Sequence, residues 1–227
     1  MCTNYRPTSR EELIEHFGVP TQAEFPDWRS EAWQDYQAPI ILGDGQKREA
    51  RLASYAFVPK QHIPPGVKRF STMNARAETI GELRSYGRFW RSAQLCLVPM
   101  VGFYEPCYES GKAVRWHIGL EHDAPFAVAG LWREWQEQDG SLCYAFTQIT
   151  INADDHPVMK RFHKPDDEKR SLVIVPEWEY DDWLGCRNPE VARSFLKLFP
   201  AEGMVVRAAA LAPRNKAASG PVSGELF

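Results

Sequence analysis

The sequence predicts an α+β protein rich in β-structure, in which a mainly antiparallel sheet is surrounded by helices. Between residues 94 and 151, four short apolar or alternating runs follow one another, separated by Gly, Asp, Glu and Pro. Such a series is typical of strands that pair with their neighbours in antiparallel order. Helical patterns lie before and after this block, so helices are expected around the sheet. The chain has 227 residues, of which 44% are hydrophobic, enough for one well-buried domain.

A short helix is expected close to the amino terminus. Thr8 or Ser9 can cap a helix over residues 10–17, and a glutamate in its first turn completes a capping box. Gly18 can end this helix, because glycine readily adopts the left-handed conformation that often follows a helix.

A hairpin is expected next. Residues 38–42 read as a strand, the Gly-Asp-Gly sequence at 43–45 as its turn, and the alternating residues 51–58 as the returning strand. Four Pro and Gly residues then indicate a loop, which leads to a helix beginning near Ala77.

The second half of the chain supplies the rest of the sheet. Its four runs are residues 94–102, 114–120, 126–132 and 142–151. After them we expect a short helix over 154–163, a buried strand over 172–175 and helices over 177–184 and 189–198. The composition predicts one domain over residues 1–211 and a loose tail, rich in Ala, Pro, Ser and Gly, over 212–227.

Composition excludes several classes of protein. Five cysteines form an odd set without a C-x-x-C pair, so neither a disulfide framework nor a zinc site is indicated, and a reducing cytoplasm fits best. The apolar runs are too short for a signal peptide or a membrane span. The net charge of -3 is not that of a strongly basic nucleic-acid binder. Local basic clusters near residues 47–51, 68–69, 84–91 and 160–164 can neutralise a few phosphates, or can be paired surface charges.

The most informative residue is Cys2, directly behind the initiator methionine. Removal of Met1 would leave an α-amine with a pKa of about 7.7–8.0 beside a thiol with a pKa of about 8.5, so both are partly nucleophilic near neutral pH. An aldehyde forms an imine with such an amine, and the thiol then closes a five-membered thiazolidine. The same group can act as an N-terminal nucleophile on an amide.

Three further features follow Cys2 in order: Asn-Ala-Arg-Ala-Glu-Thr at 74–79, Gly-Phe-Tyr-Glu-Pro at 102–106, and His163 before the apolar run 171–175. With Cys2 they resemble the SRAP family, the SOS-response-associated peptidases that process abasic sites. The resemblance runs from Cys2 to about residue 184. It implies a β-rich, barrel-like core and an activity in the DNA damage response.

The resemblance implies roles for particular residues. Cys2 would be the nucleophile, Glu105 its acid or base at the end of a strand, and Asn74 the group that positions the amine. His163 would assist opening of the sugar ring, with His156 as the alternative. The residues implied to contact DNA are Arg76, Gln37, Pro39 and Lys60, with Glu78 orienting Arg76, and with Tyr36 or Trp90 stacking against bases.

The sequence departs from the family pattern in its DNA-facing parts. Cys2 is followed by Thr3 and Asn4 in place of the usual Gly-Arg, and residues 55–60 lack the usual tryptophan-rich motif. These changes leave the proposed covalent centre intact, but they affect the residues that would bind DNA and therefore the affinity for it.

The resulting expectation is a cytoplasmic, bacterial or phage-like monomer that acts on nucleoid DNA. It would crosslink Cys2 to abasic sites in single-stranded DNA, without cofactor or metal. Two alternatives remain at this point: an N-terminal-nucleophile cysteine peptidase that processes itself, and a module that binds single-stranded DNA without chemistry.

Overall fold

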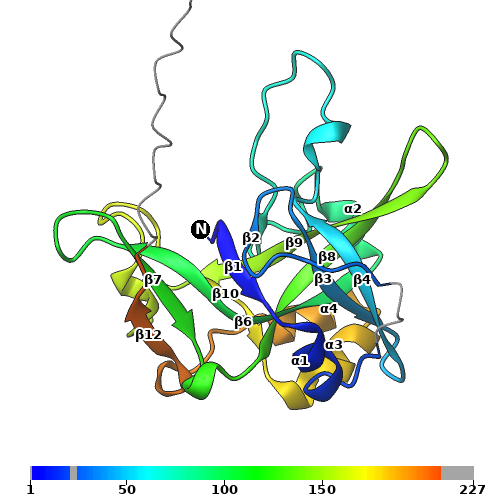
Figure 1. Cartoon of the computed structure of the whole chain (residues 1–227). Coiled ribbons are helices and arrows are strands. Elements are labelled where there is room, and N and C mark those ends of the chain that lie inside the picture. Colours follow the sequence, from blue (N-terminus) through cyan, green and yellow to red (C-terminus); the bar gives the residue numbers. More distant parts are fainter. Residues whose placement is uncertain (1, 21–24, 211–227) are drawn as a thin grey trace, which may run out of the picture.

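Five strands of the protein close into a barrel. The computed structural model describes residues 2–20 and 25–210, so the expected tail at 212–227 lies outside the described residues. The barrel strands, in the order in which they pair, are β3 (Gln37–Gly43), β4 (Arg48–Tyr55), β9 (Leu142–Asn152), β8 (Phe126–Gln136) and β6 (Leu95–Cys107). The ring closes because β6 pairs with both β8 and β3 (Figure 1). Every pairing in it is antiparallel except that of β4 with β9, so the predicted β-rich, mainly antiparallel fold is confirmed.

Shorter strands extend this barrel. β1 (Asn4–Pro7) pairs with the middle of β6 and with β2 (Ala32–Trp33). On the other edge of β6, β7 (Val114–Gly119) pairs antiparallel and carries β12 (Val205–Ala208).

Three further short strands border β8 and β9. β5 (Asn74–Arg76) runs parallel to β9, and β10 (Arg170–Leu172) runs antiparallel to it. β11 (Ile174–Val175) pairs with β8. Because β5 and β10 both border β9, they bring distant parts of the chain to one end of the sheet.

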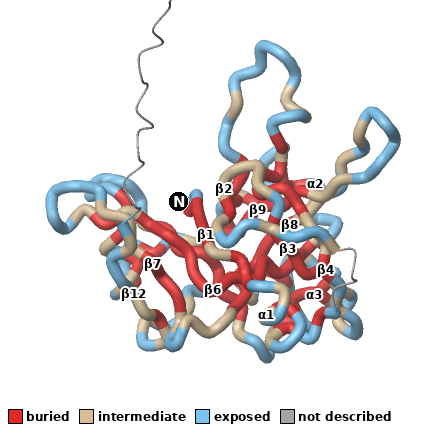
Figure 2. The backbone as a smooth tube through the Cα atoms, viewed as in Figure 1, coloured by how far each residue is buried: buried red, intermediate tan, exposed pale blue. Residues whose placement is uncertain are grey.

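Alternation along the strands divides the core in two. Ile40 and Val98 belong to one buried cluster, whereas their neighbours Ile41 and Leu97 belong to the other. Side chains from the helices join only the second cluster, among them Trp183. These helices are α1 (Arg10–Glu15), α2 (Gly87–Arg91), α3 (Tyr180–Gly185) and α4 (Pro189–Ala192). Figure 2 shows the buried backbone running along the barrel strands, with exposed loops projecting from them.

Several predicted elements are confirmed. Helix α1 begins after Ser9, whose hydroxyl accepts from the amide of Glu12 while the Glu12 carboxylate accepts from the Ser9 amide, which is a capping box. Gly18 has a φ of 64°. The hairpin forms as expected, and Oδ1 of Asp44 accepts from two backbone amides in its turn.

Two predicted helices are wrong in extent or kind. After β5 the chain forms turns until α2 at Gly87, because β5 is held by backbone hydrogen bonds to β9, and the Ala77 amide donates to Thr150 instead of starting a helix. Over 154–163 there is only the 3-10 turn η3 (Met159–Arg161). There Nδ1 of His156 accepts hydrogen bonds from the backbone amides of Val158 and Met159. In a helix these amides would donate to backbone carbonyls instead.

The carboxyl-terminal helices are close to expectation but shorter. The predicted helix at 177–184 is the 3-10 turn η4 (Glu177–Glu179) continued by α3. The helix at 189–198 ends early, as α4 and the 3-10 turn η5 (Arg193–Phe195). The predicted strand over 172–175 is divided between β10 and β11, which pair with different neighbours.

Candidate active site around Cys2

Cys2 is held at the start of β1, against the strand that carries Glu105. β1 runs antiparallel to β6, with Tyr5 opposite Phe103, and this pairing draws the amino terminus onto the barrel. Figure 1 shows this end of the chain between the long loop after β4 and the turn joining β6 to β7. Cys2 is only 1% exposed, and its thiol donates a hydrogen bond of 3.3 Å to the Asn4 carbonyl.

The backbone carbonyl of Cys2 is clamped by two side chains from different strands. Nδ2 of Asn74 donates to it at 2.6 Å, and the Tyr55 hydroxyl lies 3.1 Å away. The same hydroxyl lies 2.8 Å from Oε1 of Gln148. Within the part of the chain that the structure describes, Oδ1 of Asn74 is buried without a hydrogen-bond partner. Asn74 therefore fixes Cys2 with one end of its amide and offers an acceptor with the other.

Glu105 and His163 form a buried acid–base pair. Their side chains are 3% and 6% exposed, and Nε2 of His163 lies 3.0 Å from Oε2 of Glu105. The contact has ion-pair distance, and among the described residues neither ring nitrogen of His163 has a well-aligned hydrogen-bond partner. Glu105 lies within β6, opposite Trp116, rather than at the strand end that the sequence indicated.

The backbone at His163 adopts a conformation that few residues other than glycine adopt. Its φ is 65°, in the left-handed region, and its amide donates to the Pro106 carbonyl at 2.9 Å. Preceding it, Phe162 forms a bridge to Cys107 at the end of β6. Left-handed backbone of this kind is costly and is found disproportionately at functional sites. Here it turns the imidazole back toward β6.

Burial keeps the sulfur of Cys2 protonated. Burial raises the pKa of the Cys2 thiol to about 12, and the negative charge of Glu105 contributes to the rise. At neutral pH the thiolate is therefore scarce while Met1 is attached. A reaction that begins at the thiolate is disfavoured in this environment, and one that begins at the amine is not.

His156 has a structural role in this arrangement. Its Nε2 lies 2.8 Å from the Phe199 carbonyl, and its Nδ1 accepts from the amides of Val158 and Met159. Both nitrogens are engaged with backbone groups, so the ring has no free position for a substrate. This favours His163 over His156 as the histidine of the site.

An open pocket of about 450 Å³ lies beside Cys2. Its lining includes Thr3, Asn74, Arg76, His163, Glu168 and Arg170. The pocket joins the clamped amino terminus and the acid–base pair to two arginines and to two carboxylates, Asp167 and Glu168.

The arginines of this pocket are held by carboxylates. Nη1 of Arg76, whose side chain is half exposed, lies 2.8 Å from Glu168. Arg170 is buried and bonds Glu78 at 2.8 Å and Glu168 at 2.7 Å. The expectation that Glu78 orients Arg76 is therefore wrong, because Glu78 pairs with Arg170 instead.

The other residues implied to contact DNA are divided by their burial. Gln37 and Lys60 are exposed. Pro39 is buried inside β3, so it cannot contact DNA as expected. Trp90 is 1% exposed in the core, so it cannot stack on a base. Tyr36 is half-buried, and the Arg29 guanidinium lies 4.5 Å from the centre of its ring.

Within the described part of the chain, four residues of the basic clusters are paired with acids, namely Arg48, Arg51, Arg69 and Arg161. Ion pairs join Arg48 to Asp181 and Arg161 to Glu109, for example. These contacts agree with the alternative that such clusters are paired surface charges.

Three residues of the site were not indicated by sequence: Tyr55, Gln148 and Arg170. Each lies on a strand with an ordinary β pattern, and it is strand pairing that brings them to Cys2 and Asn74. Nothing local in the sequence marks them.

Comparison with known proteins places this geometry in a family. Residues 1–211 match the family model described as SOS response associated peptidase (SRAP). The chain belongs to the SRAP family. An SRAP relative at 31% identity, over 90% of this chain and 92% of its own, is the abasic site processing protein YobE of Bacillus subtilis. Another, YoqW of Bacillus phage SPbeta, carries the same description at 28% identity, over 90% of each chain.

Solved structures share the SRAP fold. A crystal structure of a protein from Bordetella bronchiseptica matches with a TM-score of 0.80 and 32% identity, over 92% of this chain and all of that one. A protein from Bacteroides thetaiotaomicron matches with a TM-score of 0.73 at 19% identity, covering 91% of each chain, which shows the fold alone. Among the described residues, no helix has the length and apolarity to cross a membrane.

Proposed function

We propose that, once Met1 is removed, the amine and thiol of Cys2 capture the aldehyde of an abasic site in single-stranded DNA. The observation that carries this proposal is the clamp on the Cys2 carbonyl by Asn74 and Tyr55, beside the buried pair of Glu105 and His163. The relatives named abasic site processing proteins support the same substrate.

The chemistry proceeds through two bonds to one sugar carbon. The α-amine of Cys2 adds to the aldehyde carbon, and loss of water gives an imine. The sulfur then adds to the imine carbon, its proton passes to Glu105, and the ring nitrogen is protonated in turn. The net change is aldehyde plus aminothiol to thiazolidine plus one water, without a cofactor. His163 assists by moving a proton at the sugar ring oxygen, because only the open sugar has an aldehyde.

Order of attack follows from the environment of the thiol. With Met1 attached, burial and Glu105 hold the sulfur in its protonated form, and we infer that in the mature chain the amine attacks first. Oδ1 of Asn74 is an unpaired acceptor close to Cys2, suited to holding that amine.

The DNA reaches Cys2 through the adjoining pocket. Arg76 and Arg170 line the pocket, Lys60 and Gln37 are exposed, and we expect these four side chains to meet backbone phosphates. An aldehyde must leave the base stack to enter, which is easiest in a single strand.

The N-terminal-nucleophile peptidase is the second candidate. Its thiolate would have to form at a sulfur whose pKa is about 12, which disfavours it. The third candidate is a module that binds DNA without catalysing a reaction. Such a module does not require a buried acid–base pair like Glu105 and His163.

A crosslinking experiment tests the proposal. Protein shown by mass to begin at Cys2 is incubated with a single-stranded oligonucleotide that carries one abasic site, then denatured and run on a gel. We expect a shifted band without any reductant. Cys2→Ala should give a band only when borohydride traps the imine, because its amine has no neighbouring thiol. Cys186→Ser is the matched control and should behave like the parent.

The outcomes separate the candidates. No adduct from protein that begins at Cys2 would refute the crosslinking proposal. DNA binding that does not survive denaturation would support the non-catalytic module. Cleavage of the chain's own leader by Cys2, blocked in Cys2→Ala, would support the peptidase.

A further inference from the structure

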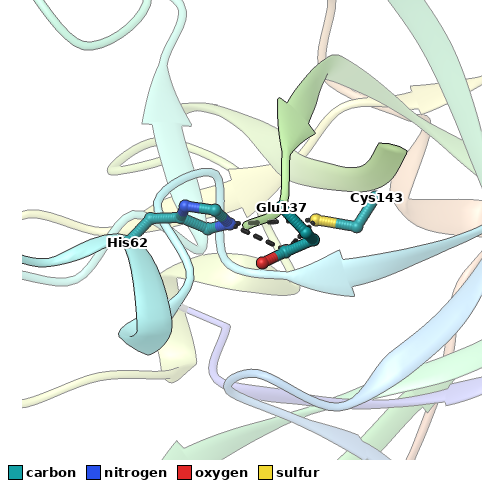
Figure 3. A group of neighbouring side chains, drawn as sticks. All are labelled: His62, Glu137 and Cys143. Atoms are coloured by element: carbon teal, nitrogen blue, oxygen red, sulfur yellow. Dashed lines mark hydrogen bonds and ion pairs between the residues drawn. The ribbon is translucent and has the colours of Figure 1, made fainter. Parts of the chain in front are cut away.

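A second cluster of reactive side chains lies outside the Cys2 site. His62 belongs to the 3-10 turn η1 (Lys60–His62) in the long loop after β4, Glu137 follows the end of β8, and Cys143 lies near the start of β9. Figure 3 shows the imidazole, carboxylate and thiol pointing toward one shared space.

The three donor atoms are close to one another. Nε2 of His62 lies 3.0 Å from Oε1 of Glu137, and Sγ of Cys143 donates to the same oxygen at 2.8 Å. Sγ and Nε2 are 3.8 Å apart. A tetrahedral zinc ion, with bonds of about 2.0–2.3 Å to S, N and O ligands, holds such atoms roughly 3.4–3.6 Å from each other. Movements below about 1 Å would convert the hydrogen-bonded cluster into that arrangement.

Surrounding groups orient these donors. The His62 ring stacks on the Trp135 ring, with centroids 4.1 Å apart and planes 17° from parallel. Trp135 is itself fixed by a hydrogen bond of 3.2 Å from Nε1 to the Phe57 carbonyl. The His62 side chain is 13% exposed and that of Glu137 is 30% exposed. Two ligands are thus set in a largely covered position that keeps one open side.

The open side can supply the remaining ligand. His62 and Glu137 face an open pocket of about 480 Å³, which also has Gln61 and Gln138 in its wall. Catalytic and regulatory zinc sites commonly combine three protein ligands with a water in the fourth position.

We propose that His62, Glu137 and Cys143 bind Zn²⁺, with a water from this pocket as the fourth ligand. A sulfur and an imidazole select zinc over magnesium or calcium, which prefer oxygen ligands. On binding, the Cys143 thiol releases its proton to solvent as the Zn–S bond forms, and the His62 proton resides on Nδ1 so that Nε2 can donate its lone pair. No electron is transferred.

Bound zinc would tie the loop after β4 to the β8–β9 hairpin. These two segments project side by side from the barrel (Figure 1). Lys60, an exposed residue that we expect to contact DNA, begins the turn that His62 ends. The metal would therefore fix a part of the molecule that approaches the nucleic acid.

Cobalt binding tests this proposal. The full chain without an affinity tag is used in a Cys2→Ala background, so that the Cys2 thiol cannot contribute to the absorption. Titration with Co²⁺ should saturate at one ion per chain with a thiolate-to-cobalt charge-transfer absorption. Excess Zn²⁺ should displace it, and excess Mg²⁺ should not.

Variants identify the ligands. Cys143→Ser should abolish the charge-transfer absorption, and His62→Gln or Glu137→Gln should weaken Co²⁺ binding at least about tenfold. Cys186→Ser is the matched control and should leave the absorption unchanged. As a second readout, Zn²⁺ should raise the Tm of the Cys2→Ala chain but not that of the chain also carrying Cys143→Ser.

Absence of the absorption in the Cys2→Ala chain, or its persistence after Cys143→Ser, would overturn the zinc proposal. Either result would leave the crosslinking proposal untouched, because crosslinking is measured with Cys2 present and no metal added.

Discussion

Glu105 acts on Cys2 in two opposing ways. Its negative charge helps to raise the pKa of the thiol, which keeps the sulfur protonated, yet in the proposed reaction its carboxylate accepts the same proton during ring closure. The two effects can be separated by a change that keeps the shape of the side chain and removes its charge.

Glu105→Gln is expected to make Cys2 easier to alkylate but slower to crosslink. Loss of the charge lowers the pKa of the thiol, so more thiolate is present at pH 8 and alkylation by iodoacetamide speeds up. Ring closure loses its proton acceptor, and a loss of about 10²–10⁴-fold is typical for a general base. Imine formation, read by borohydride trapping, should fall much less. If alkylation and crosslinking slow together, the residue is merely structural.

Asn74→Asp tests the clamp on the Cys2 carbonyl. The replacement has nearly the same shape, but a carboxylate cannot donate to the carbonyl oxygen 2.6 Å away. The Tyr55 hydroxyl still reaches the same oxygen, so the loss is that of one hydrogen bond, about 0.5–1.5 kcal/mol, and we expect crosslinking to slow roughly 2- to 10-fold. Circular dichroism should show that the fold persists. Asn188→Asp serves as the control, because Asn188 is exposed and its Oδ1 caps helix α4, a role that aspartate also fills.

The residues that sequence motifs indicated are largely those that the structure gathers. Asn74 contacts Cys2, and Glu105 contacts His163, because each motif lies on or beside a strand that reaches the amino terminus. Exposure was harder to foresee. Trp90 was expected at the surface and is in the core, since only tertiary packing decides which side of a short helix is covered.

At the scale of single elements, the packing of β7 against β6 depends on Gly102. A Cβ at Gly102 would lie 2.0 Å from Nε2 of His117, so the absence of a side chain on β6 makes room for the buried ring on β7. The two residues should therefore behave as one unit.

Gly102→Ala is expected to destabilise the protein by about 1–3 kcal/mol through overpacking. In a His117→Ala background the same change should cost much less, because the ring that it collides with is gone. Urea unfolding of the four chains gives the coupling energy. Equal costs in both backgrounds would contradict this account.

Pairing between elements is where local patterns carry least information. Alternation indicated the antiparallel strands from 94 to 151 well, but gave no sign that β4 and β5 run parallel to β9. Nor could it show the closure of β6 onto β8 and β3. These pairings join residues far apart in sequence, and each strand's own pattern is compatible with several neighbours. Of the missed residues, Tyr55 lies on β4, Gln148 on β9 and Arg170 on β10, which also borders β9.

At the scale of the whole molecule, His117 makes stability depend on pH. Burial, assisted by the nearby positive charge of Arg207, lowers the pKa of His117 to about 4 from an ordinary 6.5. The folded protein therefore holds the ring neutral, whereas the unfolded chain takes up a proton below about pH 6.5. The contribution to stability is complete above that pH and is lost as the pH falls toward 4.

We expect the free energy of unfolding to fall by about 2 kcal/mol from this residue between pH 7 and pH 5. Urea unfolding at the two pH values measures the change. His117→Asn, which cannot be protonated, should remove most of the difference even if it lowers stability at pH 7. An unchanged pH dependence would show that other groups are responsible.

The overall charge is consistent with a modest affinity for nucleic acid. The chain carries a net charge of -3, and several of its arginines already have carboxylate partners. In the proposed reaction a covalent bond to the substrate would make strong electrostatic attraction unnecessary, since the adduct would persist after a weak encounter.

β6 runs from the barrel to the edge where β7 begins, and it borders β1, β3, β7 and β8. The strand that carries Glu105 therefore has four strand neighbours among the described residues, as many as β9 has, and we expect its backbone to be rigid. Amide protons around residue 103 should exchange with deuterium only through global unfolding. Heat or denaturant should then abolish chemistry and structure in a single step.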